Sequence, residues 1–259
     1  MVLLLIKLAV TILVVVGLSL IAEKVSPKVA GVLAGYPLGS SIVLFFFGAE
    51  HGAQFAANAA IYMAAGLVGE LIFLFCYFKT SAFAKSKQDI TTPSLGALGG
   101  FFISVWLIHF IHLNALVAIL IFFTAIIIFG YLFRTIPDVR ITEKIKLPPI
   151  VVLLRGILAA GIVLIITGIA RMIGPTWAGL LGAFPTTLFP LILIIHWTYG
   201  KEYAHTFIKH VPRGLGSLLI YLICVITLYP FWGVYWGTAA SLGAATIYLI
   251  IYNQIQNKK

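Results

Sequence analysis

Long apolar runs, separated by short polar connections, occupy nearly the whole chain. They lack the alternation of polar and apolar residues that a membrane-spanning β-strand requires, so they predict helices. Most are about as long as the roughly 20 residues that a spanning helix needs. The pattern predicts an all-α polytopic membrane protein with about nine transmembrane helices, at residues 2–22, 29–48, 55–78, 94–112, 115–133, 150–172, 176–197, 211–229 and 231–252.

The chain also repeats itself, without a gap, at an offset of 148 residues. Between residues 21–78 and 169–226, 15 of 58 aligned positions are identical, among them Pro37 with Pro185 and Gly52 with Gly200. Internal duplication is typical of transporters, whose sites lie where the repeats meet. We therefore expect one repeat at residues 1–112 and a second at residues 149–259. Residues 113–148 would form a linker helix and a polar loop.

The unpaired linker helix predicts that the two four-helix repeats are inverted, because five crossings separate their starts. Assigning loops by parity places 15 of the 17 Lys and Arg residues on one side of the membrane and only Lys7 and Arg171 on the other. By the positive-inside rule the N-terminus is then outside and the C-terminus cytoplasmic, in the cell membrane. Lys7 and Arg155 are expected to extend their charged ends to the membrane surface.

Composition narrows the function classes. The chain is 62% hydrophobic and 9% charged, with a mean hydropathy of +1.12, which leaves no room for a soluble domain. Its net charge of +10 lies in short loops, which orients helices in a lipid bilayer and gives no groove for nucleic acid. Cys76 and Cys224 are expected to be buried small side chains without a disulfide. The first segment aligns with an internal span and is expected to be a retained helix.

Two matched proline sites are the strongest candidates for a functional site. Pro37 and Pro185 lie inside the second helix of each repeat, and Pro190 follows. A proline inside a helix leaves a carbonyl without its donor, here Leu33, Leu181 and Thr186, and at membrane depth such a group needs another partner. Kinks that only permit close helix packing are the alternative interpretation. The candidate substrate-binding residues are Tyr36, Pro37, Ser40, Ser41, Phe184, Pro185, Thr186 and Thr187.

Glu70 is a second candidate. It precedes Lys79 by nine residues, about 13 Å along a helix, which places it near the middle of a bilayer. Intramembrane carboxylates commonly relay protons or cations. A neutral helix contact near Ser217 or Thr227 is the alternative.

Histidines give weaker signals. His205, Lys209, His210 and Arg213 share one helical face, where orienting charge is the preferred interpretation over anion or lipid headgroup binding. His109 and His112 have no nearby carboxylate in sequence, so we expect interfacial placement and no metal site. No nucleophile, base and acid combination is evident. Neither an enzyme nor a cofactor is expected.

Residues 30–78 and 178–229 resemble the small bacterial inner-membrane family called GlpM, whose members are single four-helix units. The resemblance rests on Ala178-Gly179-Leu180 and Phe184-Pro185-Thr186; the first repeat departs from it, with Tyr36-Pro37-Leu38. It implies a four-helix fold unit in each repeat, and a history in which a dual-topology dimer fused through an added helix. It implies no substrate. Fused fluoride channels and small multidrug transporters resemble this plan in architecture alone.

The leading hypothesis is a transporter that binds a small solute or ion between the Pro37 and Pro185 breaks, with Glu70 as a possible proton-coupling group. An oligomer is possible but not required. A passive ion channel built from the same residues is one alternative. An accessory protein for lipid or polysaccharide export, without transport of its own, is another. The sequence does not identify the substrate.

Overall fold

The computed structural model describes residues 2–22, 35–84, 86, 88–137, 139 and 149–257. Regular structure in these ranges is entirely helical, which confirms the all-α expectation. Two short 3-10 turns, Ser81–Phe83 and Phe133–Thr135, follow α4 and α6. The helices are α1 (Val2–Ala22), α3 (Leu38–His51), α4 (Ala53–Thr80), α5 (Thr91–His109), α6 (Ala115–Leu132), α7 (Pro149–Gly182), α8 (Leu188–Tyr199) and α9 (Lys201–Asn257).

Five helical stretches of the described chain are long and apolar enough to cross a membrane, so this is a multi-pass membrane protein. They are Ala53–Phe83, Thr91–His109, Ala115–Thr135, Val152–Gly182 and Lys201–Tyr252. The first three coincide with expected spans. The expected span at 176–197 is instead interrupted, and the spans at 211–229 and 231–252 both belong to α9. That helix begins at Lys201, earlier than the sequence indicates, so Lys201 and Lys209 are helical and not in a loop.

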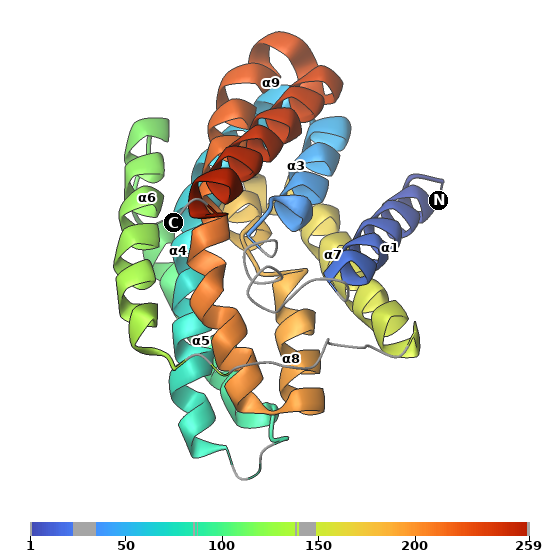
Figure 1. Ribbon diagram of the computed structural model, residues 1–259. Helices are drawn as coiled ribbons and strands as arrows, with labels where there is room; N and C mark the ends of the chain where they lie inside the picture. Colours follow the sequence, from blue (N-terminus) through green and yellow to red (C-terminus); the bar gives the residue numbers. More distant parts are fainter. Residues whose placement is uncertain are drawn as a thin grey trace.

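Two glycines bend the longest helices. Gly174 in α7 has a φ of 73° and Gly233 in α9 has a φ of 71°. Glycine adopts such angles without the steric cost that a Cβ brings. Figure 1 shows the result for α9, which folds back on itself as two limbs. Apolar runs that the sequence presents as separate spans are therefore joined by sharp bends instead of loops.

Helix α4 lies at the centre of the molecule and contacts α3, α5, α6, α7 and α9. Small residues allow this close packing. A Cβ added to Gly179 of α7 would lie 2.1 Å from the carbonyl oxygen of Ala59, and one added to Gly100 of α5 would lie 2.6 Å from the sulfur of Cys76. The central position of α4 brings its side chains into contact with both halves of the chain.

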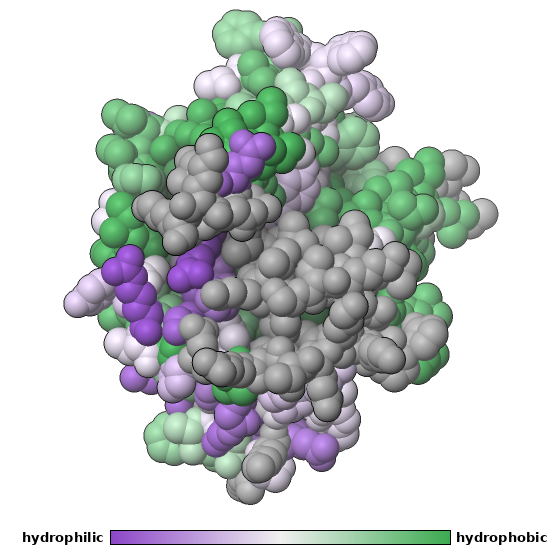
Figure 2. Space-filling model, viewed as in Figure 1, coloured by the Kyte–Doolittle hydropathy of each residue, from purple (hydrophilic) through white to green (hydrophobic). Residues whose placement is uncertain are grey.

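The outer surface is apolar. Large hydrophobic side chains are exposed along α5, α6, the first part of α7 and the second limb of α9. Figure 2 shows this hydrophobic surface, with hydrophilic residues gathered mainly in the lower half of the view. Phe231, Trp232, Tyr235 and Trp236 are exposed together beside the bend of α9. Aromatic residues of this kind favour the membrane–water interface.

Candidate functional site

The two proline sites are non-helical segments whose backbones match. The first break comprises the described residues 35–37, directly before α3, and the second comprises residues 183–187, between α7 and α8. Residues 23–34 lie outside the described residues. The amide of Leu38 donates to the carbonyl of Tyr36 at 2.7 Å, and the amide of Thr186 donates to that of Phe184 at 2.7 Å. These two hydrogen bonds are related by the 148-residue offset. The next pair follows the same offset, since Ser41 donates to Pro37 at 2.7 Å and Phe189 donates to Pro185 at 2.8 Å.

The short helices that follow the breaks also end alike. Helix α3 is followed directly by Gly52, with a φ of 93°, and α8 is followed directly by Gly200, with a φ of 95°. Each glycine amide donates over 2.9 Å to the carbonyl four residues earlier, at Gly48 and His196 respectively. Break, short helix and glycine turn thus recur as one unit. In Figure 1, α3 extends upward from the middle of the molecule and α8 extends downward.

The two breaks lie against each other. A Cβ added to Gly39, at the start of α3, would lie 2.6 Å from Oγ1 of Thr186 and 3.3 Å from Cγ2 of Thr187. Residues that are 147 positions apart in the chain are therefore neighbours. The expectation that both breaks belong to one site is consistent with this geometry.

Each break also packs on the long helix of the other half. A Cβ on Gly35 would meet the backbone of Gly214 in α9 at 2.4 Å, while a Cβ on Gly66 in α4 would lie 2.9 Å from Cβ of Ala183. Gly35 aligns with Ala183, and Gly66 with Gly214, at the 148-residue offset. The same contact therefore occurs twice, with the halves exchanged. Ser217 adds a hydrogen bond of 3.2 Å to the carbonyl of Gly35.

The sequence predicts that the prolines leave three backbone carbonyls without a helical hydrogen-bond donor, and the structure shows that this does not hold for two of them. The carbonyl of Leu181 accepts from the amide of Phe184 at 3.0 Å, so it is satisfied locally. Pro190 lies in the first turn of α8, where an amide has no acceptor within its helix, so it does not deprive Thr186 of a helical donor. The prediction was wrong for these two carbonyls, because the helix ends at Gly182 before the proline. Leu33 lies outside the described residues.

The candidate residues at the two breaks differ in their burial. Thr186 and Ser41 are buried, and Ser41 donates to the carbonyl of Leu38 at 2.9 Å. Ser40 and Thr187 are half-buried, and both prolines, Pro37 and Pro185, are buried. The hydroxyl of Tyr36 lies 2.8 Å from that of Thr246 in the second limb of α9.

The aromatic residues make the two sides chemically different. Phe184 lies in a cluster of rings, with centroids 6.2 Å from Phe73, 5.2 Å from Phe101 and 6.0 Å from Phe189. At the equivalent positions of the first break stand Tyr36 for Phe184 and the fully buried Tyr221 for Phe73. Edge-to-face phenyl rings form an apolar wall, whereas phenols bring hydroxyls. The rings around Phe184 are therefore all phenyl rings, whereas the equivalent aromatic residues of the first half carry hydroxyls.

Glu70 is buried, with 7% of its surface exposed, on the face of α4 that meets the second break. It lies one turn beyond Gly66, which contacts Ala183, and three residues before Phe73, which contacts Phe184. Residues three and four apart share a helix face. Ser217 and Thr227, the neighbours named in the alternative interpretation, donate to backbone carbonyls.

A second buried polar cluster was not predicted from the sequence. Lys7 of α1 forms a 2.5 Å ion pair with Glu50 of α3 and donates to Thr167 of α7 over 2.8 Å. The expectation that Lys7 extends to the membrane surface was wrong, since it is 6% exposed. A carboxylate within reach makes burial less costly than snorkelling. In the sequence, the one indication of this cluster is the single charge of Lys7 within an apolar helix. The side chain of Arg155, which was also expected to reach the membrane surface, lies outside the described residues.

The remaining singled-out residues contact other side chains of the protein. His205 lies 2.7 Å from the hydroxyl of Ser81, and Arg213 lies 3.0 Å from Nδ1 of His210. His109 stacks on Trp177 with centroids 4.2 Å apart. Both cysteines are free and half-buried. Within the described residues no three His, Cys, Asp or Glu side chains are grouped as metal ligands.

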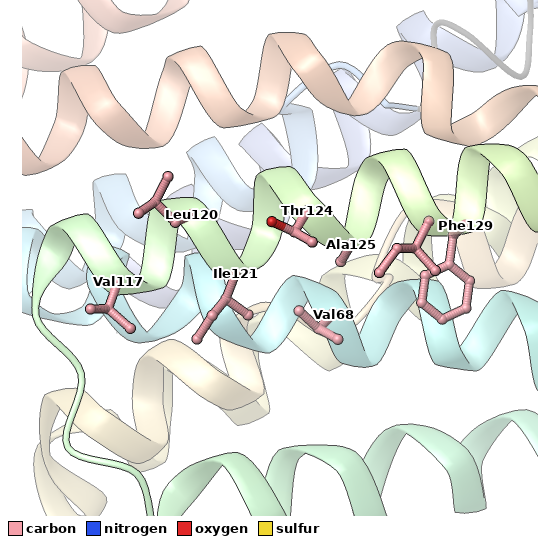
Figure 3. A pocket seen from close by; sticks show the side chains of 8 residues that line it. Val68, Val117, Leu120, Ile121, Thr124, Ala125 and Phe129 are labelled. Carbon is pink, nitrogen blue, oxygen red and sulfur yellow. The ribbon is translucent and has the colours of Figure 1, made fainter.

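A surface hollow lies away from this junction. It lies between α4 and α6 (Figure 3), and its volume is about 420 Å³. Val68 comes from α4 and the other lining residues, Thr124 and Phe129 among them, from α6. Thr124 is the one polar side chain in this lining, so the hollow offers space for hydrocarbon and no recognition chemistry.

Comparisons of the chain with protein-family models, with curated proteins and with solved structures found no match.

Proposed function

We propose that this protein is a membrane transporter that moves a small solute or ion through the junction of the two breaks. The observation that carries the proposal is the double contact at this junction, in which each break packs on the long helix of the other half. Secondary transporters bind substrate where discontinuous helices of two inverted repeats meet near the bilayer midplane.

The inversion itself is part of the proposal. The matched hydrogen bonds and the opposite directions of α3 and α8 support it (Figure 1). Two inverted repeats have equivalent alternative conformations, so an exchange of their conformations opens the junction first to one side and then to the other. We further propose nine crossings, with the N-terminus outside and the C-terminus in the cytoplasm. The GlpM-like ancestry of each repeat stays part of the same hypothesis.

Glu70 is proposed as the proton-coupling group. Glu70 is buried and belongs to the face of α4 that also carries Gly66, which packs on Ala183 of the second break. A charged carboxylate is costly inside a membrane, so proton binding and release there are tied to access of water or substrate. A proton that is bound from one side and released to the other would drive solute movement.

Proteoliposomes loaded with a pH-sensitive dye test the proposal. A panel of small anions, cations and neutral solutes is applied to the wild type, to Glu70→Gln and to Glu202→Gln. Glutamine keeps the volume of Glu70 and its capacity for hydrogen bonds, but it cannot release a proton. We expect at least one solute to change the internal pH with the wild type and with Glu202→Gln, and none with Glu70→Gln. Glu202 is a suitable control because it is exposed in the first turn of α9.

Other outcomes separate the alternatives. Rapid, non-saturating ion flux without a pH change would indicate a passive channel. Flux of no solute or ion, together with co-purification of an export enzyme, would indicate an accessory protein. Full gradient-driven uptake by Glu70→Gln would leave Glu70 as a neutral helix contact. Solute exchange in the absence of a gradient should survive in this variant, because exchange does not require the proton to leave.

A further inference from the structure

A groove between α6 and the two limbs of α9 is separate from the junction of the breaks. Its volume is about 700 Å³. Apolar side chains line much of it, but three basic residues and three tyrosines also belong to its wall. The lining residues are Phe123, Ile126, Ile127, Gly130, Tyr131, Arg134, Lys209, Pro212, Arg213, Gly216, Leu219, Ile220, Tyr248 and Tyr252.

The basic residues gather at one end of the groove. Helix α6 and the first limb of α9 run in opposite directions (Figure 1). Arg134, just beyond the end of α6, is therefore level with Lys209 and Arg213 near the start of α9. Phe123 is level with Ile220, further along the groove. Figure 2 shows hydrophilic residues near the lower end of α6.

Two of these cations are available to a ligand. Arg134 and Arg213 are exposed, and neither forms an ion pair with a carboxylate in the described chain. Arg213 is held 3.0 Å from Nδ1 of His210, which orients its guanidinium group. Tyr248 and Tyr252 stack with centroids 6.1 Å apart and add phenol groups to the wall. A guanidinium group binds a phosphate through two parallel hydrogen bonds.

We propose that this groove binds an anionic phospholipid. The phosphate lies between Arg134 and Arg213, and the acyl chains lie along the apolar stripe that continues from Gly130 to Phe123. Charge complementarity identifies the headgroup, and the polar-to-apolar gradient along the groove identifies a lipid instead of a soluble anion. Basic residues near a membrane surface attract anionic lipids by roughly 1 kcal/mol each, which is about a fivefold gain in affinity.

Native mass spectrometry of the detergent-purified protein tests the site. The probes are dioleoyl phosphatidylglycerol and dioleoyl phosphatidylcholine, which share acyl chains and differ in net charge. We expect the wild type to prefer phosphatidylglycerol. Arg134→Gln with Arg213→Gln should weaken its binding by roughly 25-fold, as two fivefold contributions multiply. The control is Lys79→Gln, an exposed cation on α4 that is not part of the groove.

A second variant tests the acyl-chain half without touching a charge. A Cβ on Gly130 meets only Pro212, at 3.9 Å, so there is room for a Cβ at this position, and the rest of the leucine side chain in Gly130→Leu occupies the groove that Gly130 lines. It should weaken phosphatidylglycerol binding while leaving the thermal unfolding of the lipid-free protein unchanged. Equal binding of both lipids, or an effect of Lys79→Gln as large as that of the double variant, would overturn the proposal. Binding of inorganic phosphate that Gly130→Leu leaves unaffected would show an ion site and overturn it too.

Discussion

At the scale of single residues, Gly35 allows the first break to lie close to α9 because glycine has no side chain. A Cβ on Gly35 would meet backbone atoms of α9 at 2.4–2.6 Å, and a backbone cannot move aside as the end of a side chain can. Gly35→Ala should therefore force the break away from α9, destabilise the protein by about 1–3 kcal/mol and impair transport. Thermal unfolding in detergent and uptake in proteoliposomes are the measurements.

Gly99→Ala is the matched control for this substitution. No atom lies within 4 Å of a Cβ added there, and the residue is inside α5. Alanine is a better helix former than glycine by up to about 1 kcal/mol, so this variant should be as stable as the wild type or more so. If Gly35→Ala and Gly99→Ala unfold at the same temperature and transport equally well, the close approach at Gly35 affects neither stability nor transport.

The Lys7–Glu50 pair supports a second prediction at this scale. Lys7→Met leaves Glu50 without its cation in a largely buried place, and removing one partner of a buried pair typically costs about 3–5 kcal/mol. Replacing both, as Lys7→Met with Glu50→Leu, removes the charge and should restore much of the loss. Thermal midpoints of the two single variants and the double variant form the cycle. Additive losses would indicate that the two side chains do not interact.

At the scale of elements, we expect the prolines to disfavour continuous helix at the two breaks. Pro185→Ala gives the second break an amide donor and a helix-forming residue between α7 and α8. The variant should be more stable to heat but transport less, and Pro37→Ala should behave in the same way. Pro93→Ala is the control, because Pro93 lies in the first turn of α5, where proline does not interrupt a helix. Normal transport by both break variants would make the prolines packing features.

The elements also differ in how well sequence patterns specify them. The helices α4, α5 and α6 agree with the expected spans to within a few residues, because each is a continuous apolar run between polar connections. The bends at Gly174 and Gly233 were missed. A glycine in an apolar run is compatible with a straight helix, a close contact or a bend, and only the packing of neighbouring elements selects among these.

At the scale of the whole molecule, the distribution of positive charge predicts orientation. A tag placed before Met1 should react with an impermeant reagent from outside the cell, and one after Lys259 only after permeabilisation. An engineered cysteine at Asn114, in the short connection between α5 and α6, reports a third point and should label from outside. Finding both ends on the same side would rule out nine crossings, and the inversion with them.

The sequence alone determined that the chain is helical and lies in a membrane, because continuous apolar runs have no other stable arrangement in hydrocarbon. It also predicted which segments correspond, from the prolines and glycines that align at the 148-residue offset. Only the tertiary structure brought Gly39 against Thr186, packed the face of α4 that carries Gly66 on Ala183, and paired Lys7 with Glu50. These contacts depend on how the helices cross and where they bend. Crossing and bending follow from the fit of whole surfaces, which no local pattern of residues records.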